Sequence, residues 1–390
     1  MWNIMSERYI EKRLSSIKAR SHSRVLSIAK GMDGVINLSG GDPDFDTPGH
    51  ITEALKEAIA GGKTHYPPTH GLPSLRGAIA EYHGKHAVDW EAGEVTITAG
   101  SGVSLFASTM GTVNPGEEVI LLEPYYMRYS NLVEYIGARE VGVPLNETNG
   151  YRFDLEALKE NLSGKTKLII LCNPNNPSGT VFTKEELRGI ADVATDEDLL
   201  VLSDEVYCEF LWDGREHTTL ASLPGMRERT IISSSFSKTF AMTGWRLGYF
   251  IAEKSLTSNI RKIPLGYRTN IFVQIAGVAA MRGPWEPVNA MAEEYARRRK
   301  YMVPRLSAIE GINCHNSEGS YFLFPNIEDL GIGSEEFCES LLREKKILAR
   351  PGTTFGNTGE GHIRISLTKS IEDLEEIAQS IEDHVKMTID

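Results

Sequence analysis

The sequence predicts an α/β fold: a large domain with a mainly parallel seven-stranded sheet flanked by helices, and a smaller α+β domain. From about residue 94 to residue 252, short apolar runs typical of β-strands alternate with helical segments, as in a parallel sheet covered on both faces. The last hundred residues instead show two strand-like runs, SYFLFPN and GHIRISL, among predicted helices at 334–345 and 370–386. We expect an N-terminal arm and part of the small domain at 1–46, the large domain at 47–284 and the small C-terminal domain at 285–390.

Size and charge restrict the class of function. The chain has 390 residues, 41% of them hydrophobic, which is enough for two domains with buried cores. The net charge of −12 and the dispersed basic residues argue against a nucleic-acid binder. The four cysteines have neither CxxC nor metal-ligand spacing, so we expect no metal site and a reducing, cytoplasmic location. No stretch is apolar enough for a membrane span or a secretory signal.

The N-terminal part predicts helices separated by two loops. Residues 1 to about 36 are expected to form a charged helix that leads to an apolar run. In the next loop, SGGDPDFDTPGHI, Gly40 and Gly41 either let the backbone approach a ligand closely or form an ordinary turn. Thr47 is expected to cap the helix HITEALKEAIAGG, which ends at its two glycines. The second loop is rich in proline and carries Tyr66.

Polar and aromatic residues follow the predicted strands at their C-terminal ends, where ligands bind in sheets of this kind. After EVTIT, a glycine turn opens a helix, and the free N–H groups of Gly100, Ser101 and Gly102 can hold an anion. After EEVILL, Tyr125 and Tyr126 either offer an aromatic face to a flat cofactor or simply pack.

Two further strand ends carry candidate residues. After KLIILC, Asn176 lies in the loop NPNNPSGT, either as an amide that binds a ligand or as part of an ordinary turn. After DLLVLS, Asp204 stands at the strand end and Tyr207 three positions later, so one turn of helix would bring both to the same side. A carboxylate in that position usually caps a helix, but it can also pair with the protonated nitrogen of a bound ring.

The segment SSSFSKTFAMTGWRLG, residues 233–248, holds the densest set of reactive groups. Its single lysine, Lys238, is surrounded by small hydroxylated residues, and Arg246 follows eight positions later. No acid lies between Glu228 and Glu253. Arginine and hydroxyl groups together bind phosphate, and an amine beside a phosphate ester predicts a lysine that holds pyridoxal 5′-phosphate (PLP) as a Schiff base. The alternative is a serine-rich turn with a solvated lysine.

The C-terminal part adds a candidate arginine and a basic run. Arg364 alternates with isoleucines in GHIRISL and therefore points away from the side that they cover. It either binds a carboxylate through two hydrogen bonds or forms a surface ion pair. The run Arg297-Arg298-Arg299-Lys300 lies in a long polar helix from Val288 to about Glu310, and we interpret it as a solvated helix face.

Taken together, the motifs resemble those of a known family. SGGDPDFDTP, YPPTHGLPSLRGAIA, NPNNPSGT, SDEVY, SFSKTFAMTGWRLGY and RPGTTFG…GHIRISL are similar, in order and spacing, to motifs of the class I/II aminotransferases, the fold type I PLP enzymes of the aspartate aminotransferase superfamily. The likeness covers nearly the whole chain. It implies an aminotransferase (EC 2.6.1.-) of amino-acid metabolism that moves an amino group between an L-amino acid and a 2-oxo acid by a ping-pong mechanism. It also implies a cytoplasmic homodimer without nucleic-acid or membrane partners.

The resemblance implies a role for each candidate residue. Lys238 would form the internal aldimine with PLP and, once freed, move a proton as general acid and base. Asp204 would pair with the pyridine nitrogen, Tyr207 and Asn176 would hydrogen-bond the ring hydroxyl, and Tyr126 would stack on the ring. The phosphate would be held by Ser101, Gly102, Ser235 and Arg246, with Tyr66 contributed to the neighbouring active site of the dimer. The substrate α-carboxylate would be bound by Arg364, Asn176 and the backbone of Gly41.

The sequence leaves open which amino acid is the substrate and which reaction follows loss of the proton from its α-carbon. Arg128 and Arg268, near the expected pocket mouth, either accept an acidic substrate such as aspartate or glutamate or are surface charges. An aromatic or large apolar pocket could instead be lined by Tyr125, Tyr126, Phe45 and Tyr267. A C–S β-lyase or a cyclopropane-forming synthase would use the same cofactor-binding residues. A ligand sensor in a transcription regulator is disfavoured, because the first thirty-odd residues contain no helix-turn-helix.

Overall fold

The computed structural model describes Leu14 and residues 22–389. Its largest element is a sheet of eight strands. These strands are β2 (Val95–Thr98), β3 (Glu118–Glu123), β4 (Arg139–Asn146), β5 (Arg152–Phe153), β6 (Thr166–Cys172), β7 (Leu200–Asp204), β8 (Thr230–Ser235) and β9 (Gly248–Ile251). All seven predicted runs form strands. The eighth strand, the two-residue β5, pairs with the end of β4 and was not predicted.

The order of strands in the sheet is β2-β9-β8-β7-β6-β3-β4-β5. Parallel pairing joins β8, β7, β6, β3 and β4. Strand β9 runs antiparallel to both of its neighbours, β8 and β2. Strands β2, β3, β6, β7 and β8 therefore point in one direction, and their C-terminal ends meet at one edge of the sheet. This edge is the place at which a ligand site was expected.

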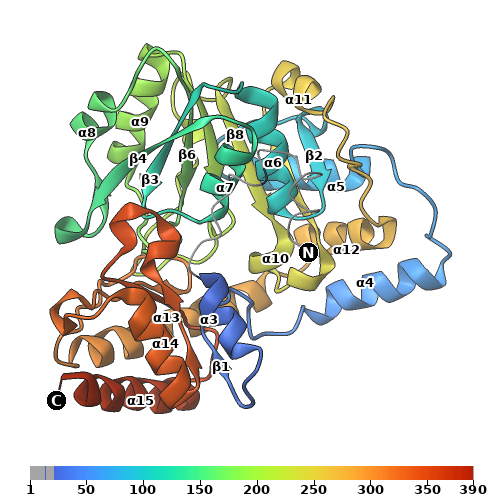
Figure 1. Ribbon diagram of the computed structural model, residues 1–390. Helices are drawn as coiled ribbons and strands as arrows, with labels where there is room; N and C mark the ends of the chain where they lie inside the picture. The colour runs from blue at the N-terminus through green and yellow to red at the C-terminus, as the bar shows by residue number, and fades with distance from the viewer. Residues whose placement is uncertain (1–13, 15–21, 390) are drawn as a thin grey trace, which may run out of the picture.

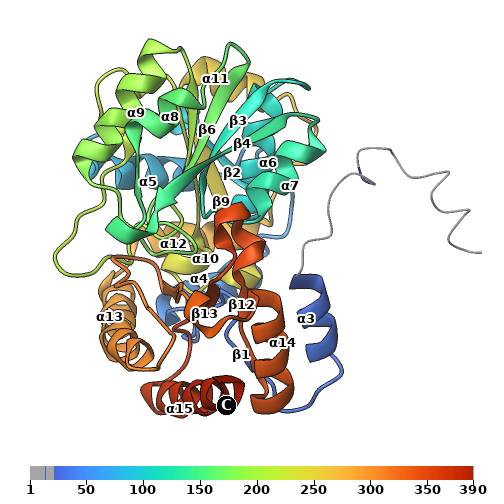
Figure 2. The ribbon, with the colours of Figure 1, turned by 60° about the vertical axis from the view of Figure 1, so that its left-hand side comes forward.

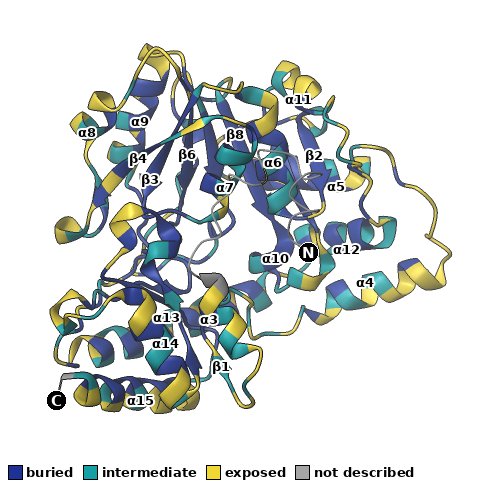
Figure 3. Cartoon of the chain, in the orientation of Figure 1, coloured by how far each residue is buried: buried dark blue, intermediate teal, exposed yellow. Residues whose placement is uncertain are grey.

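Helices cover both faces of the sheet (Figures 1 and 2). Strand β3 shows why, because it is apolar on both sides: Val119 and Leu121 pack into one hydrophobic core, and Ile120 and Leu122 into another. Figure 3 shows the strands buried between helices whose outer faces are exposed. The helices of this part are α4 (Gly49–Ala60), α5 (Pro73–Gly84), α6 (Ser101–Thr112), α7 (Arg128–Tyr135), α8 (Leu155–Glu160), α9 (Lys184–Asp196), α10 (Phe236–Thr239), α11 (Lys254–Ile260) and α12 (Ile271–Arg282).

A smaller group of elements packs below the large sheet in Figure 2. Strand β1 (Ile36–Asn37) pairs in parallel with β11 (Ile347–Leu348), so a segment near the N-terminus joins the C-terminal part of the chain. A second small sheet has the order β10 (Phe322–Leu323), β13 (Ile363–Ser366), β12 (Arg350–Pro351), and both of its pairings are antiparallel. The surrounding helices are α3 (His22–Ala29), α13 (Glu286–Ser307), α14 (Ser334–Lys345) and α15 (Ile371–Ile389).

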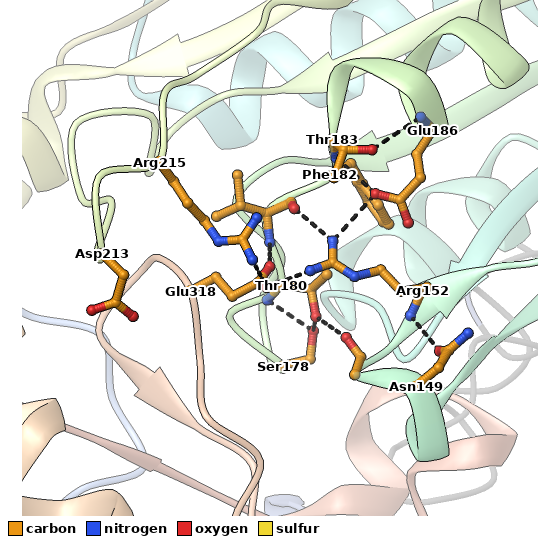
Figure 4. A network of polar contacts seen from close by, with 12 residues as sticks. Asn149, Arg152, Ser178, Thr180, Phe182, Thr183, Glu186, Asp213, Arg215 and Glu318 are labelled. Carbon is orange, nitrogen blue, oxygen red and sulfur yellow. Dashed lines mark hydrogen bonds and ion pairs between the residues drawn. The ribbon is translucent and has the colours of Figure 1, made fainter.

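A network of ion pairs around Glu318 ties the segment before β10 to the edge of the large sheet (Figure 4). The carboxylate of Glu318 pairs with Arg152 and Arg215 and accepts a hydrogen bond of 3.0 Å from the backbone nitrogen of Val181. Arg152 also pairs with Glu186 of α9 across 3.2 Å. One carboxylate thus holds together groups from four separate segments of the chain.

The basic run of α13 is not the solvated face that its sequence suggested. Arg298 and Arg299 are buried. Arg298 pairs with Asp44 at 2.8 Å and with Glu294 at 2.9 Å, and Arg299 pairs with Asp213 at 2.5 Å. The interpretation was wrong for these two residues because loops distant in sequence supply the carboxylates that make burial of a guanidinium possible.

Two local predictions are also corrected. Thr47 does not cap α4: its hydroxyl donates to the backbone oxygen of Ala241 at 2.7 Å, and the residue before the helix is Pro48. Tyr207 does not lie on a helix, because a short turn follows β7. The predicted N-terminal helix includes α3, but it ends at Ala29, and residues 30–35 form turns and irregular structure; residues 1–13 and 15–21 of that prediction lie outside the described residues.

Candidate active site

A cavity of about 730 Å³ opens at the C-terminal ends of the parallel strands. It brings together most of the predicted site residues from separate loops, and only Ser235, Arg246 and Tyr66 are not in its lining. The predicted residues that line it are Gly41, Ser101, Gly102, Tyr126, Asn176, Asp204, Tyr207, Lys238 and Arg364. The loops that carry these residues therefore meet at one cavity, as the interpretation of a ligand site requires.

Lys238 lies in α10 just after β8 and extends into the cavity. Its amine donates a hydrogen bond to the backbone oxygen of Gly41. Burial lowers the pKa of Lys238 to about 8, and the positive charges of Arg364 and Arg246 act in the same direction. The side chain is therefore not the solvated lysine of the alternative interpretation, and a considerable fraction of it is neutral near pH 8.

Asp204 is buried at the end of β7. Burial raises the pKa of its carboxyl to about 6, while a hydrogen bond from the hydroxyl of Tyr129, 2.8 Å long, acts against this rise. Tyr129 also lines the cavity and was not predicted. A signal was present in the sequence, since Tyr129 stands three positions after Tyr126 and that spacing places two residues on one side of a helical turn.

Arg364 is buried on β13 and is held in place from two sides. It donates hydrogen bonds to Asn176 Oδ1 at 2.8 Å and to the backbone oxygen of Ser39 at 2.5 Å. Its guanidinium lies 4.0 Å from the ring centre of Phe322. Among the residues that the structure describes, no carboxylate forms an ion pair with it. Arg364 is thus not a surface ion pair, and its charge faces a cavity that can admit an anion.

The start of α6 forms a cradle with Arg246. Gly100 precedes the helix with φ of 88°, and a Cβ atom there would lie 2.5 Å from Nη2 of Arg246. On the other side, a Cβ atom on Gly248 would lie 2.6 Å from the carbonyl carbon of Gly100. Ser235 pairs with Gly248 in the sheet, and its buried hydroxyl has no hydrogen-bond partner among the residues that the structure describes. A helix N-terminus, a guanidinium and an unpaired hydroxyl suit a phosphate group.

The residues expected at the pocket mouth divide into two groups. Arg128 lines the cavity, and a Cβ atom on Gly102 would lie 3.2 Å from its Nη1. Arg268 does not line it and instead lies 5.2 Å above the ring of Tyr66, which is 84% exposed on the loop after α4. Of the four aromatic residues considered for a pocket, only Tyr126 lines the cavity.

The cavity contains a third arginine, beside Arg128 and Arg364, that the sequence did not reveal. Arg350, on β12, is directly opposite Arg364 of β13 in the antiparallel register. The motif RPGTTFG contains it, but only the pairing of the two strands brings it to the site.

The sequence family agrees with this arrangement. A model of the aminotransferase class I and II family matches residues 33–381. The chain belongs to this family. Aromatic-amino-acid aminotransferase 2 of Thermococcus litoralis is 38% identical over 383 residues, which are 97% of this chain and 98% of that protein. An aspartate aminotransferase of Pyrococcus horikoshii is 39% identical over 379 residues, 96% of each chain.

Solved structures give the same result. The aromatic aminotransferase from Pyrococcus horikoshii OT3 matches with a TM-score of 0.89 and 38% identity, covering 94% of this chain and 99% of that chain. A single mutant of Thermus thermophilus aspartate aminotransferase matches with a TM-score of 0.90 and 30% identity, covering 96% and 99%. The protein is therefore an aminotransferase of fold type I, in a family that depends on PLP. Across residues 22–389, no cluster of His, Cys, Asp or Glu is suited to a metal ion, and none of the helices has the length and apolarity to cross a bilayer.

Proposed function

We propose that this aminotransferase binds PLP in the cavity and transfers an amino group between an L-amino acid and a 2-oxo acid in a ping-pong reaction. The observation that supports this most directly is the meeting of Lys238, Asp204 and Arg364 in one cavity. These residues supply an amine with a lowered pKa, a buried carboxylate and a buried guanidinium that forms no ion pair within the described part of the chain. When bound, PLP supplies a carbonyl group that condenses with amines and a conjugated ring that stabilises negative charge at the substrate α-carbon.

The residues present fit this cofactor. A positive ring nitrogen next to Asp204 would offset the burial of the carboxylate and keep it ionised. Tyr126 offers an aromatic face, and Tyr207 and Asn176 offer polar groups to a ring hydroxyl. The unpaired hydroxyl of Ser235, with Arg246 and the N-terminus of α6 at Ser101 and Gly102, would hold the phosphate.

The reaction then depends on two residues of the chain. Arg364 would bind the α-carboxylate, with Asn176 fixing the plane of the guanidinium and the backbone of Gly41 close by. Lys238, when neutral, would take the proton from the substrate α-carbon and, as an acid, would deliver it to the C4′ carbon of the bound cofactor. Its lowered pKa suits both directions of this transfer.

The proposal includes a cytoplasmic homodimer. Tyr66 does not line the cavity of its own chain, and α4 with the loop that follows it projects from the body of the molecule (Figure 1). In a dimer, this loop would bring Tyr66 to the phosphate in the neighbouring site. We also propose the domain limits 1–46, 47–284 and 285–390, which limited proteolysis with mass spectrometry would test.

The spectrum of the PLP-loaded enzyme tests the function. Single amino acids should convert the absorbance of bound PLP into that of pyridoxamine phosphate, and 2-oxo acids should restore it. The variant Lys238→Ala should still bind PLP but should lose turnover. Release of ammonia and pyruvate without formation of pyridoxamine phosphate would favour the C–S β-lyase instead. Absence of any PLP absorbance would contradict the proposed role of the cavity.

A further inference from the structure

Two arginines project side by side into the cavity. Arg350 and Arg364 are directly opposite in an antiparallel strand pair, and opposite residues in such a pair point to the same face. Both side chains donate to one acceptor, the backbone oxygen of Ser39, at 3.1 Å from Arg350 Nε and 2.5 Å from Arg364 Nη2. The two positive charges are therefore held close together.

Neither charge is compensated by a carboxylate of the described residues. In the part of the chain that the structure describes, neither Arg350 nor Arg364 forms an ion pair. Apart from Ser39, the acceptor recorded for Arg350 is the sulfur of Met127 at 3.0 Å, and a thioether is a weak acceptor. Burial lowers the pKa of Arg350 to about 10 and that of Arg364 to about 9, and Arg350 itself contributes to the shift at Arg364. Two closely spaced guanidinium groups with lowered pKa values and no ion-pair partner in the described chain favour a ligand with two anionic groups over a ligand with one.

The charged side chains of the described cavity lining do not supply an anion for Arg350. Among the described residues in its lining, Asp204 is the single carboxylate, and it is engaged by Tyr129. The remaining cations are Lys238 and Arg128. Arg128 is exposed at the start of α7, where water screens its charge, whereas Arg350 is only partly exposed. Of these two arginines, Arg350 gains more from an anionic ligand.

We propose that Arg350 is a specificity-determining residue that binds a second carboxylate, at the end of the substrate side chain. The preferred substrates are then dicarboxylic amino acids and their 2-oxo acids. This inference rests on the proposed function, in which Arg364 takes the α-carboxylate. An aromatic or aliphatic side chain in the same place would leave Arg350 without an anion.

The test compares Arg350→Met with the wild-type enzyme in single-turnover reactions, followed by the absorbance of bound PLP. For glutamate and aspartate, the ratio of rate to dissociation constant should fall by about 10- to 100-fold, as expected for loss of a charge-assisted contact. For alanine and phenylalanine, it should change less than about 3-fold, since neither uses the contact. Arg350→Lys, which keeps the charge, should recover part of the loss. Arg343→Met, on the exposed surface of α14, is the control.

Equilibrium binding gives a second readout that does not need turnover. Succinate carries two carboxylates and no amine, and butyrate carries one carboxylate. Calorimetry of the PLP-loaded wild-type enzyme should show tighter binding of succinate than of butyrate, and Arg350→Met should abolish the difference. This comparison within the wild type still applies if the variant folds poorly.

Several results would overturn the inference. An equal loss for all four amino acids would mean that Arg350 helps to hold the α-carboxylate. If Arg128→Met lowers the ratio of rate to dissociation constant for glutamate and aspartate alone, and Arg350→Met does not, the second carboxylate is bound by Arg128. A wild-type enzyme that converts neutral amino acids and rejects both acidic ones would reject the inference but keep the proposed function. If no amino acid is converted at all, both fail.

Discussion

The hydroxyl of Tyr129 donates a hydrogen bond of 2.8 Å to Asp204 Oδ2, and both residues are buried. The contact joins α7 to the end of β7 and places a donor on the carboxylate that is proposed to face the cofactor ring. Hydrogen bonds to charged groups are among the stronger ones in proteins, so this contact favours the ionised form of Asp204.

Replacing Tyr129 by Phe should therefore weaken cofactor binding. Without the donor, the pKa of Asp204 should rise further above about 6, and the dissociation constant for PLP at pH 7 should increase by about 10-fold. Fluorescence titration of the apo-enzyme measures this constant. Tyr267→Phe is the matched control, because Tyr267 is also buried but donates to the backbone oxygen of Ile260, outside the cavity. Equal effects of both variants would argue against a specific role for Tyr129.

Loading of the apo-enzyme should depend on pH through Lys238. The amine reacts when neutral, and its pKa of about 8 lies below the ordinary value of 10.5. The rate of PLP binding should therefore rise with pH through about 8 and level off above it. Stopped-flow absorbance between pH 6.5 and about 9.5 would follow this rise. A rate that continues to climb towards pH 10 would show that Lys238 is not shifted.

Glu318→Gln should destabilise the fold without touching the cavity. The substitution leaves Arg152 and Arg215 without their shared partner, and their side chains are only 20% and 34% exposed. We expect the free energy of unfolding to fall by about 2 kcal/mol, less than for a fully buried pair. Urea unfolding measures the change. The control is Glu156→Gln, which removes an exposed ion pair with Lys159 and should lower the free energy of unfolding by less than about 0.5 kcal/mol. Similar losses in Glu318→Gln and Glu156→Gln would contradict the role of the network.

Gly100→Ala should damage the proposed phosphate cradle. The φ of 88° and ψ of 165° at this position are adopted almost only by glycine, and strain of this kind costs about 1–3 kcal/mol. The added Cβ atom would also push against the guanidinium of Arg246. PLP affinity should fall by at least about 10-fold. Gly77→Ala, in α5 with no atom near the new Cβ, should bind PLP like the wild type, and normal affinity in Gly100→Ala would exclude the cradle.

The sequence predicted the part of the site that depends on strand direction. Asp204 ends a strand, Asn176 and Lys238 each follow one, and parallel strands bring their C-terminal ends to one edge. It did not predict contacts that depend on pairing between distant segments. Arg350 reaches the cavity only through its register with Arg364, and the burial of Arg298 depends in part on Asp44, 254 positions away, which supplies a carboxylate. Local patterns contain no information on such partners.

The close packing of Gly100 against Gly248 also bears on how the enzyme is made. Gly100 follows β2 and Gly248 begins β9, and these two adjacent strands are synthesised far apart in time. When Lys238 and Arg246 have just been synthesised, the nascent chain does not yet contain β9, the strand against which the start of α6 packs. Pairings between such distant segments form late, because closing a long loop costs entropy before any contact offsets it. Capture of the cofactor would thus mark a chain whose folding is essentially complete.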